Sequence, residues 1–311
     1  MTGAGDATPG GDPVTGAGDS AAGFVALAGR PNVGKSTLVN AIVGSKVAIV
    51  SDKPQTTRRA IRGIAVRGAA QLVLVDLPGV QRPRDALTQR MQSRVEHELR
   101  DSDAALLLLN AEQGVGPGDR FIAAALVQAG VPVVIAVNKI DRLDRAHTVA
   151  ALQAAAELDV CDEIFPISAR RGTGVGALVE HLCGLLPAGP HLYAVGEHSD
   201  QPEAVLLAEL IREQVLRRTF QEIPHAVEVV VEEIDSSRED LVRVQALAWV
   251  EADSQKGILI GARGKMIKAI GTAARREIEC RLATRVHLDL SVRVRRRWRA
   301  DDALLDRLGI E

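Results

Sequence analysis

Apolar runs alternate with helical patterns through the first half of the chain. The runs occupy residues 24–28, 71–75, 104–110, 131–138 and 163–168, and residues 61–67 alternate between apolar and polar as a strand does. The first run ends in a glycine-rich turn, and a helix is expected from Lys35 to about Val43. Buried strands of this kind, alternating with helices, predict a mostly parallel, doubly wound α/β sheet.

The pattern changes after residues 188–202, which are rich in Pro, Gly and polar residues and are expected to be an interdomain linker. A helix at 203–220, strands at 226–234 and 241–252, a helix, a second helix at 264–283 and a strand at 286–294 are expected next. A short helix near 302–308 closes the chain. The sequence therefore predicts an α/β domain at 21–187 and an α+β domain at 203–311. Residues 1–20, rich in small and polar residues, are expected to be a disordered tail.

Composition permits a packed core, because 46% of residues are apolar and 25% are charged. The net charge is −2, but the charge is unevenly distributed. Residues 201–254 hold 5 Arg and 12 acidic residues, whereas residues 255–300 hold 13 Lys and Arg and 3 acidic residues. Such a basic stretch suggests contact with nucleic acid, but a solvated charged surface is a common alternative, so the charge distribution alone is a weak signal. Three cysteines without metal-ligand or disulfide spacing favour a reduced compartment and no zinc site.

The first motif with clear chemistry runs from Gly29 to Ser36 and reads G-R-P-N-V-G-K-S, which matches the phosphate-binding loop G-x-x-x-x-G-K-[ST]. It lies between a predicted strand and a predicted helix, where backbone N–H groups and the helix N-terminus can surround phosphate oxygens. Lys35 would reach the β- and γ-phosphates, and Ser36 would bind Mg²⁺. The candidate nucleotide contacts here are Gly29, Arg30, Pro31, Asn32, Val33, Gly34, Lys35, Ser36 and Thr37.

Three further motifs follow in order at the ends of predicted strands. They are D-L-P-G (Asp76, Leu77, Pro78, Gly79), N-K-I-D (Asn138, Lys139, Asp141) and S-A (Ser168, Ala169). Asp76 could hold Mg²⁺ through water, and the Gly79 N–H could bind the γ-phosphate. Asp141 could accept hydrogen bonds from N1–H and the 2-amino group of guanine, and adenine would leave this carboxylate unpaired at a cost of roughly 1–3 kcal/mol. The four motifs together predict a GTP site.

A second site is predicted in the C-terminal half. Gly261, Ala262, Arg263 and Gly264 form a G-x-x-G loop before a predicted helix that carries Lys265 and Lys268. This loop and the α-β-β-α-α-β order resemble a type II KH domain, in which the loop clamps a nucleic-acid backbone. The cluster Arg293, Arg295, Arg296, Arg297 and Arg299 with Trp298 suits backbone contacts and a base stack, or equally a solvated strand end.

The phosphate loop, extended to Thr37 and Leu38, together with Q-T-T-R (Gln55–Arg58), resembles the Era branch of the translation-factor-related GTPases. The resemblance implies that residues 55–58 form a switch loop in which Thr56 or Thr57 contacts Mg²⁺, with Thr57 preferred. Lys35, Thr57 and Gly79 would then act in catalysis, and Ser36, Thr57 and Asp76 would hold the metal. Val80 stands where related GTPases place a water-orienting Gln, which predicts slow intrinsic turnover. Asn32 matches the residue that recruits K⁺ in several relatives.

The same resemblance implies cofactors GTP or GDP with Mg²⁺, and binding near the 3′ end of 16S rRNA during assembly of the 30S ribosomal subunit. It implies a cytoplasmic monomer that can contact the inner face of the membrane without a transmembrane segment. Two alternatives stay open from the residues alone. One is a membrane-associated signalling or cell-cycle GTPase, and the other is an RNA-binding scaffold with weak turnover.

Overall fold

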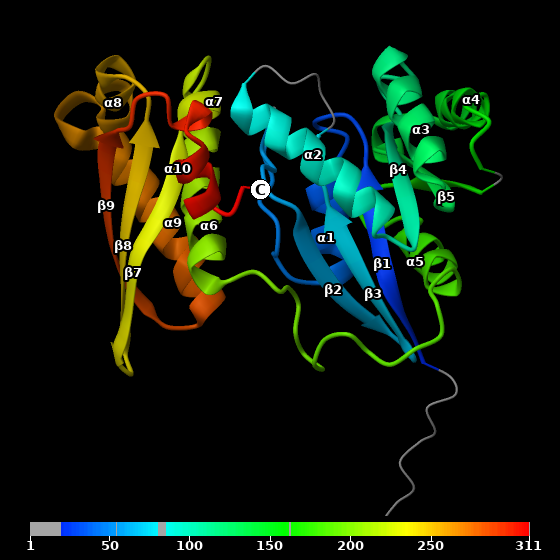
Figure 1. Cartoon of the computed structure of the whole chain (residues 1–311), viewed down its shortest axis with the longest axis horizontal. Coiled ribbons are helices and arrows are strands. Elements are labelled where there is room, and N and C mark those ends of the chain that lie inside the picture. Colours follow the sequence, from blue (N-terminus) through cyan, green and yellow to red (C-terminus); the bar gives the residue numbers. More distant parts are fainter. Residues whose placement is uncertain (1–19, 54, 80–84, 162, 311) are drawn as a thin grey trace, which may run out of the picture.

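The computed structural model describes residues 20–53, 55–79, 85–161 and 163–310, which fold into two lobes joined by an extended segment (Figure 1). The strands of the first lobe are β1 (Ala21–Ala28), β2 (Ile61–Arg67), β3 (Ala70–Asp76), β4 (Ala104–Asn110), β5 (Val133–Asn138) and β6 (Ile164–Ile167). Its helices are α1 (Lys35–Val43), α2 (Ala86–Arg100), α3 (Pro117–Ala129), α4 (Arg145–Ala156) and α5 (Val175–Gly184), with the 3₁₀ turn η1 (Ile140–Arg142). Residues 1–19 of the expected tail and Val80 lie outside the described residues.

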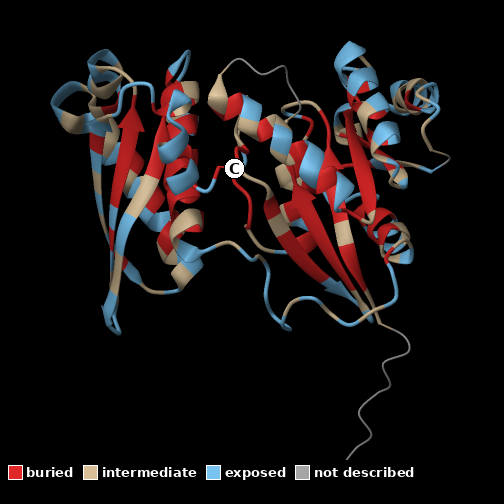
Figure 2. Ribbon diagram, in the orientation of Figure 1, coloured by how far each residue is buried: buried red, intermediate tan, exposed pale blue. Residues whose placement is uncertain are grey.

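The six strands form one sheet in the order β2-β3-β1-β4-β5-β6. All neighbouring pairs are parallel except β2 with β3, which confirms the mostly parallel sheet. Helices α1 and α5 pack on one face through an apolar cluster, and α2, α3 and α4 pack on the other. The central strands are therefore buried on both sides (Figure 2). The carboxyl ends of the parallel strands meet at one edge, where the loops after β1, β3, β5 and β6 converge.

The second lobe is a three-stranded sheet covered by helices. Its elements are α6 (Glu203–Arg218), α7 (Ile223–Ala226), β7 (Glu228–Arg238), β8 (Leu241–Val250), α8 (Asp253–Ile260), η2 (Ala262–Gly264), α9 (Lys265–Leu282), β9 (Arg285–Val294), η3 (Trp298–Ala300) and α10 (Asp302–Arg307). The sheet order is β7-β8-β9, with β7 antiparallel and β9 parallel to β8. The expected α-β-β-α-α-β order is present. The strand expected from residue 226 begins later, because residues Ile223–Ala226 form a short helix with Pro224 in its first turn.

The segment expected to be a linker lies along the first lobe. Gln71 binds it at two points, since its Oε1 accepts from the N–H groups of Leu192 and Tyr193 and its Nε2 donates to the Tyr193 carbonyl. The Ile64 N–H also donates to the His198 carbonyl at 2.9 Å. The composition of this segment predicted a connection between domains, but it did not reveal that the connection is docked on β2 and β3.

The two lobes share a hydrophobic cluster. Leu87 and Met91 of α2 pack with Trp249 of β8, Trp298 of η3 and Leu305 of α10. Figure 1 shows α2 and α10 at the boundary between the lobes. Across the described parts of the chain, none of the helices is long and apolar enough to cross a bilayer.

Candidate nucleotide and RNA sites

The loop between β1 and α1 has a backbone that only glycine can adopt at two points. Gly29 has φ of 152° and Gly34 has φ of 106°. A Cβ on Gly29 would lie 2.6 Å from the Leu108 carbonyl oxygen, and one on Gly34 would lie 2.4 Å from Asn138 Nδ2. The loop is thereby held tightly around the start of α1, which suits a phosphate cradle.

Lys35 is buried within this loop. Its Nζ donates to the carbonyls of Gly29 at 3.0 Å and Arg30 at 3.3 Å. Burial lowers the pKa of Lys35, and the nearby Asp76 carboxylate opposes that effect. Phosphate oxygens placed in the loop would favour the charged ammonium, because an adjacent anion stabilises it.

Three oxygen-bearing side chains meet at the start of α1. Ser36 Oγ donates to Asp76 Oδ2 at 2.6 Å, and Thr57 Oγ1 lies 3.3 Å from both Ser36 Oγ and Asp76 Oδ2. Burial raises the pKa of Asp76, whose Oδ1 is buried and, among the described residues, has no hydrogen-bond partner. Hydroxyl and carboxylate oxygens with an unused acceptor suit Mg²⁺ and its waters. Thr56 Oγ1 instead donates to the Lys53 carbonyl, so the structure brings Thr57 to this cluster.

The remaining residues of the first two motifs have different orientations. Leu77 is 1% exposed in the core, as expected for a side chain that points away from the phosphates. Gly79 lies against Pro31, and a Cβ there would be 3.0 Å from the proline ring. The Arg30 side chain is turned away and forms an ion pair with Asp119, so only its backbone can serve the nucleotide.

The loops after β5 and β6 form a second pocket beside the phosphate loop. Asn138 Nδ2 donates to the Val33 carbonyl at 2.8 Å, which ties the two loops together. Ser168 Oγ donates to Asp141 Oδ1 at 2.7 Å, and this hydrogen bond holds the pKa of Asp141 below its usual range. The Ala169 N–H donates to Asn138 Oδ1 at 2.9 Å, which connects the loops after β5 and β6.

The G-x-x-G loop lies between α8 and α9. Gly261, Arg263 and Gly264 have φ of 71°, 53° and 75°, so the chain turns sharply and exposes its backbone. A Cβ on Gly261 would lie 2.7 Å from the Met266 Cβ. Lys265 and Lys268 are exposed on the first turns of α9. The arrangement can hold a phosphodiester backbone against a helix N-terminus.

Comparison with known proteins finds a family match in each of the two lobes. Residues 24–139 match the family described as 50S ribosome-binding GTPase, and residues 222–299 match the KH domain family. GTPase Era of Mycobacterium tuberculosis is 47% identical over 293 residues, covering 92% of this chain and 98% of that protein. The chain belongs to the Era family of GTPases. This confirms the resemblance drawn from the phosphate loop and the G-x-x-G loop.

Two solved Era structures share the arrangement of both lobes. A variant of Aquifex aeolicus Era bound to GDP.AlF4- has a TM-score of 0.89 at 32% identity and covers 93% of this chain and 99% of its own. Era in complex with MgGDPNP and nucleotides 1506-1542 of 16S ribosomal RNA also has a TM-score of 0.89 at 32% identity, covering 94% and 99%.

Sequence reasoning missed several residues of this Era-type site. Ser51 and Lys53 line the phosphate end of the nucleotide pocket, and Arg170 lines the base end. In the second lobe, Thr272 and Arg275 were missed; they line a groove between α9 and β9 together with the predicted Lys268. The spacing of those three residues on one helix face was the available signal, because positions four and three apart are neighbours.

The arginine cluster at the end of β9 was expected either to contact nucleic acid, with a base stacked on Trp298, or to be a solvated strand end. Trp298 is 0% exposed, and its Nε1 donates to the Ala226 carbonyl at 2.9 Å. A base therefore cannot stack on this indole, and the stacking prediction is wrong for Trp298. Arg299 is also engaged, in an ion pair with Asp85, whereas Arg295, Arg296 and Arg297 are exposed.

Proposed function

We propose that this GTPase is a switch that binds the 3′ region of 16S rRNA in its GTP-bound state and assists assembly of the small ribosomal subunit. A phosphate cradle with guanine-selecting residues and a KH groove lie in one chain. The Era structure with MgGDPNP and 16S rRNA nucleotides, matched over 94% of this chain, supports the pairing of these two ligands.

Ser36, Thr57 and Asp76 would hold Mg²⁺, and the bound metal would neutralise charge on the β- and γ-phosphates. Lys35 and the Gly79 N–H would face the γ-phosphate, and Asp141 would select guanine. The support for these assignments is the 2.6 Å and 3.3 Å oxygen contacts and the 2.7 Å bond that orients Asp141.

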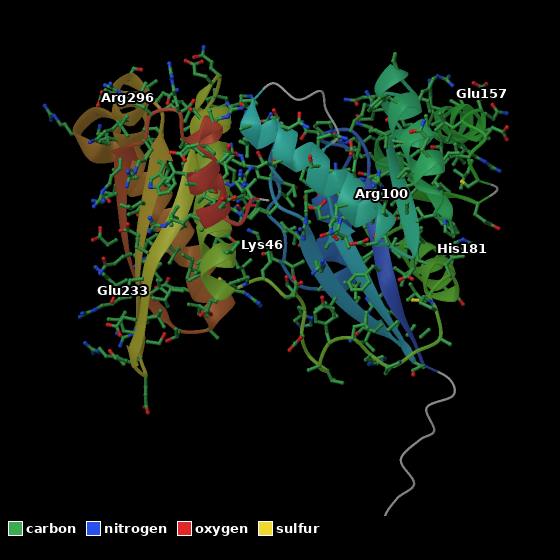
Figure 3. All side chains as sticks on the ribbon, viewed as in Figure 1. Lys46, Arg100, Glu157, His181, Glu233 and Arg296 are labelled. Carbon is green, nitrogen blue, oxygen red and sulfur yellow. The ribbon has the colours of Figure 1, made fainter. Side chains whose placement is uncertain are left out.

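On the RNA side, the exposed G-x-x-G loop would hold the backbone and the groove beside β9 would receive bases. β9 is an edge strand, so its outer backbone groups can hydrogen-bond a base. Arg296, labelled in Figure 3 beside α8, belongs to the exposed arginines that would extend the phosphate contacts. Low aromatic content, 2%, favours reading by hydrogen bonds over extensive stacking.

The test is an RNA-binding titration of the full chain with a fluorescent oligonucleotide of the 16S rRNA 3′ end. We expect tighter binding with Mg²⁺ and a non-hydrolysable GTP analogue than with GDP, and weaker binding to a scrambled oligonucleotide. Equal affinity in both nucleotide states would refute the switch. We also propose that the protein lies in the cytoplasm and contacts the membrane only at its surface. Binding to phosphatidylglycerol vesicles is therefore measured in parallel. Vesicle binding stronger than RNA binding would favour the membrane-signalling alternative.

A further inference from the structure

The segment between α1 and β2 is held by both lobes, and several of its contacts come from the second lobe. Ile49 packs in the hydrophobic core of the KH lobe, and the Val50 N–H donates to Glu213 Oε1 at 2.9 Å. Lys46, which lies between the lobes in Figure 3, forms ion pairs with Glu213 and Glu277 at 2.6 Å and 2.9 Å. The switch loop is thus enclosed by the RNA-binding lobe rather than by its own domain alone.

The contacts become closest on either side of Thr57. The Thr56 carbonyl accepts a hydrogen bond from Arg212 Nη2 of α6. Arg58 is fully buried, and its Nη1 donates to Glu228 Oε2 at 2.5 Å. The same guanidinium also donates to the carbonyls of Pro224, His225 and Val227. The residues before and after Thr57 are therefore both fixed to the KH lobe.

Arg212 is itself rigidly placed. Its side chain is 0% exposed, and it donates to Glu209 from Nε at 3.1 Å and from Nη2 at 2.6 Å. Burial would lower the pKa of Arg212, but the carboxylates of Glu209 and Glu228 outweigh it and raise the pKa. Nη2 donates both to Glu209 and to the Thr56 carbonyl, so the bidentate pair with Glu209 fixes the nitrogen that holds this carbonyl.

We propose that Arg212 of the KH lobe is a positioning residue for GTP hydrolysis. By holding the Thr56 carbonyl, while Glu228 holds Arg58, it sets Thr57 Oγ1 beside Ser36 and Asp76. This inference rests on the proposed role of Thr57 as a Mg²⁺ ligand. A threonine of this kind contributes when the γ-phosphate is present, so Arg212 should affect Mg²⁺-dependent GTP turnover and leave GDP affinity unchanged.

The experiment compares the full-length chain with Arg212→Met. Turnover is measured as a function of Mg²⁺ concentration, and affinities are measured for GDP and for a non-hydrolysable GTP analogue. Loss of one charged hydrogen bond predicts about a 10-fold higher Mg²⁺ requirement and about a 10-fold lower kcat, with GDP affinity within about twofold. Arg218→Met is the matched control, because Arg218 on the same helix bonds only Gln214 among the contacts the structure describes.

Three further variants complete the design. Arg212→Lys keeps a charge and a donor, so partial recovery of the Mg²⁺ dependence is expected. Glu228→Gln tests the opposite flank of Thr57 with little change of shape, and it should shift the Mg²⁺ dependence in the same direction. All variants are measured below their melting temperatures.

Thr57→Ala separates the proposed metal-ligand role of Thr57 from the positioning role of Arg212, because unchanged Mg²⁺ dependence in that variant would overturn the metal-ligand role itself. A shift with Thr57→Ala but not with Arg212→Met or Glu228→Gln would overturn the positioning role alone.

Discussion

Replacing Ser168 with alanine should weaken guanine nucleotide binding without slowing hydrolysis at saturation. Ser168 is 0% exposed at the end of β6, and its Oγ donates to Asp141 Oδ1 at 2.7 Å. The substitution leaves the Asp141 carboxylate in place but frees its rotation. A hydrogen bond to a charged group contributes about 1.5–3 kcal/mol, part of which water can replace at this accessible pocket. About 1.4 kcal/mol remains, which is a tenfold loss of affinity.

The assay is calorimetry with GDP and with a non-hydrolysable GTP analogue. Both should weaken equally, because the change lies at the base end of the pocket, and kcat should stay within about twofold. Selectivity for GTP over ITP, which lacks the 2-amino group, should shrink. Ser102→Ala is the control, since Ser102 is also buried and its Oγ donates to the Glu98 carbonyl at 2.7 Å in α2. An unchanged affinity in Ser168→Ala, or an equal loss in Ser102→Ala, would refute the reasoning.

Three other outcomes test separate parts of the molecule. Asn32, whose Nδ2 donates to the Asp52 carbonyl, matches the residue that recruits K⁺ in several relatives, so turnover should be faster in KCl than in NaCl at equal ionic strength, and Asn32→Ala should remove the difference. Lys268→Gln should reduce the log–log salt slope of RNA binding by about 0.7, measured by anisotropy. Burial opposes ionisation of Glu228, but Arg59 and Arg58 lower its pKa to about 2. Its contribution to stability is therefore present above its ordinary pKa and is lost as pH falls toward 2, and urea unfolding should show a cost of about 3–5 kcal/mol for Glu228→Gln at pH 7 that shrinks at pH 3.

The nucleotide site could be predicted because each of its parts is a short local pattern. Glycine is required at positions 29 and 34, because a Cβ on Gly29 or Gly34 would clash with a neighbouring backbone or side chain. Asp76 and Asn138 are the last residues of strands that the sequence shows as apolar runs. The order of these motifs fixes which strand ends meet. The G-x-x-G loop could be found for the same reason, since Gly261 occupies a turn that excludes a Cβ.

The contacts between the lobes could not be predicted from one sequence. The sequence predicts only that Arg58 belongs to a switch loop. Its ion-pair partner Glu228 lies 170 positions further along the chain. Trp298 stands among five arginines, which suggested exposure, but α2 of the other lobe and α10 bury it. Burial of this kind depends on how two domains dock, and that docking leaves no periodic signal within either domain.

The contacts between the lobes explain why the second lobe has separate acidic and basic stretches. Its acidic stretch supplies Glu209, Glu213 and Glu228, which form buried or partly buried ion pairs with basic residues of the segment between α1 and β2. Its basic stretch, including Lys268, remains exposed for RNA. Salt screens exposed charges strongly and buried pairs weakly. Raising the salt concentration should thus release RNA while the segment between α1 and β2 stays attached to the KH lobe. If the bound nucleotide still changes RNA affinity at every salt concentration, long-range charge cannot carry that effect. The contacts between the two lobes must then carry it.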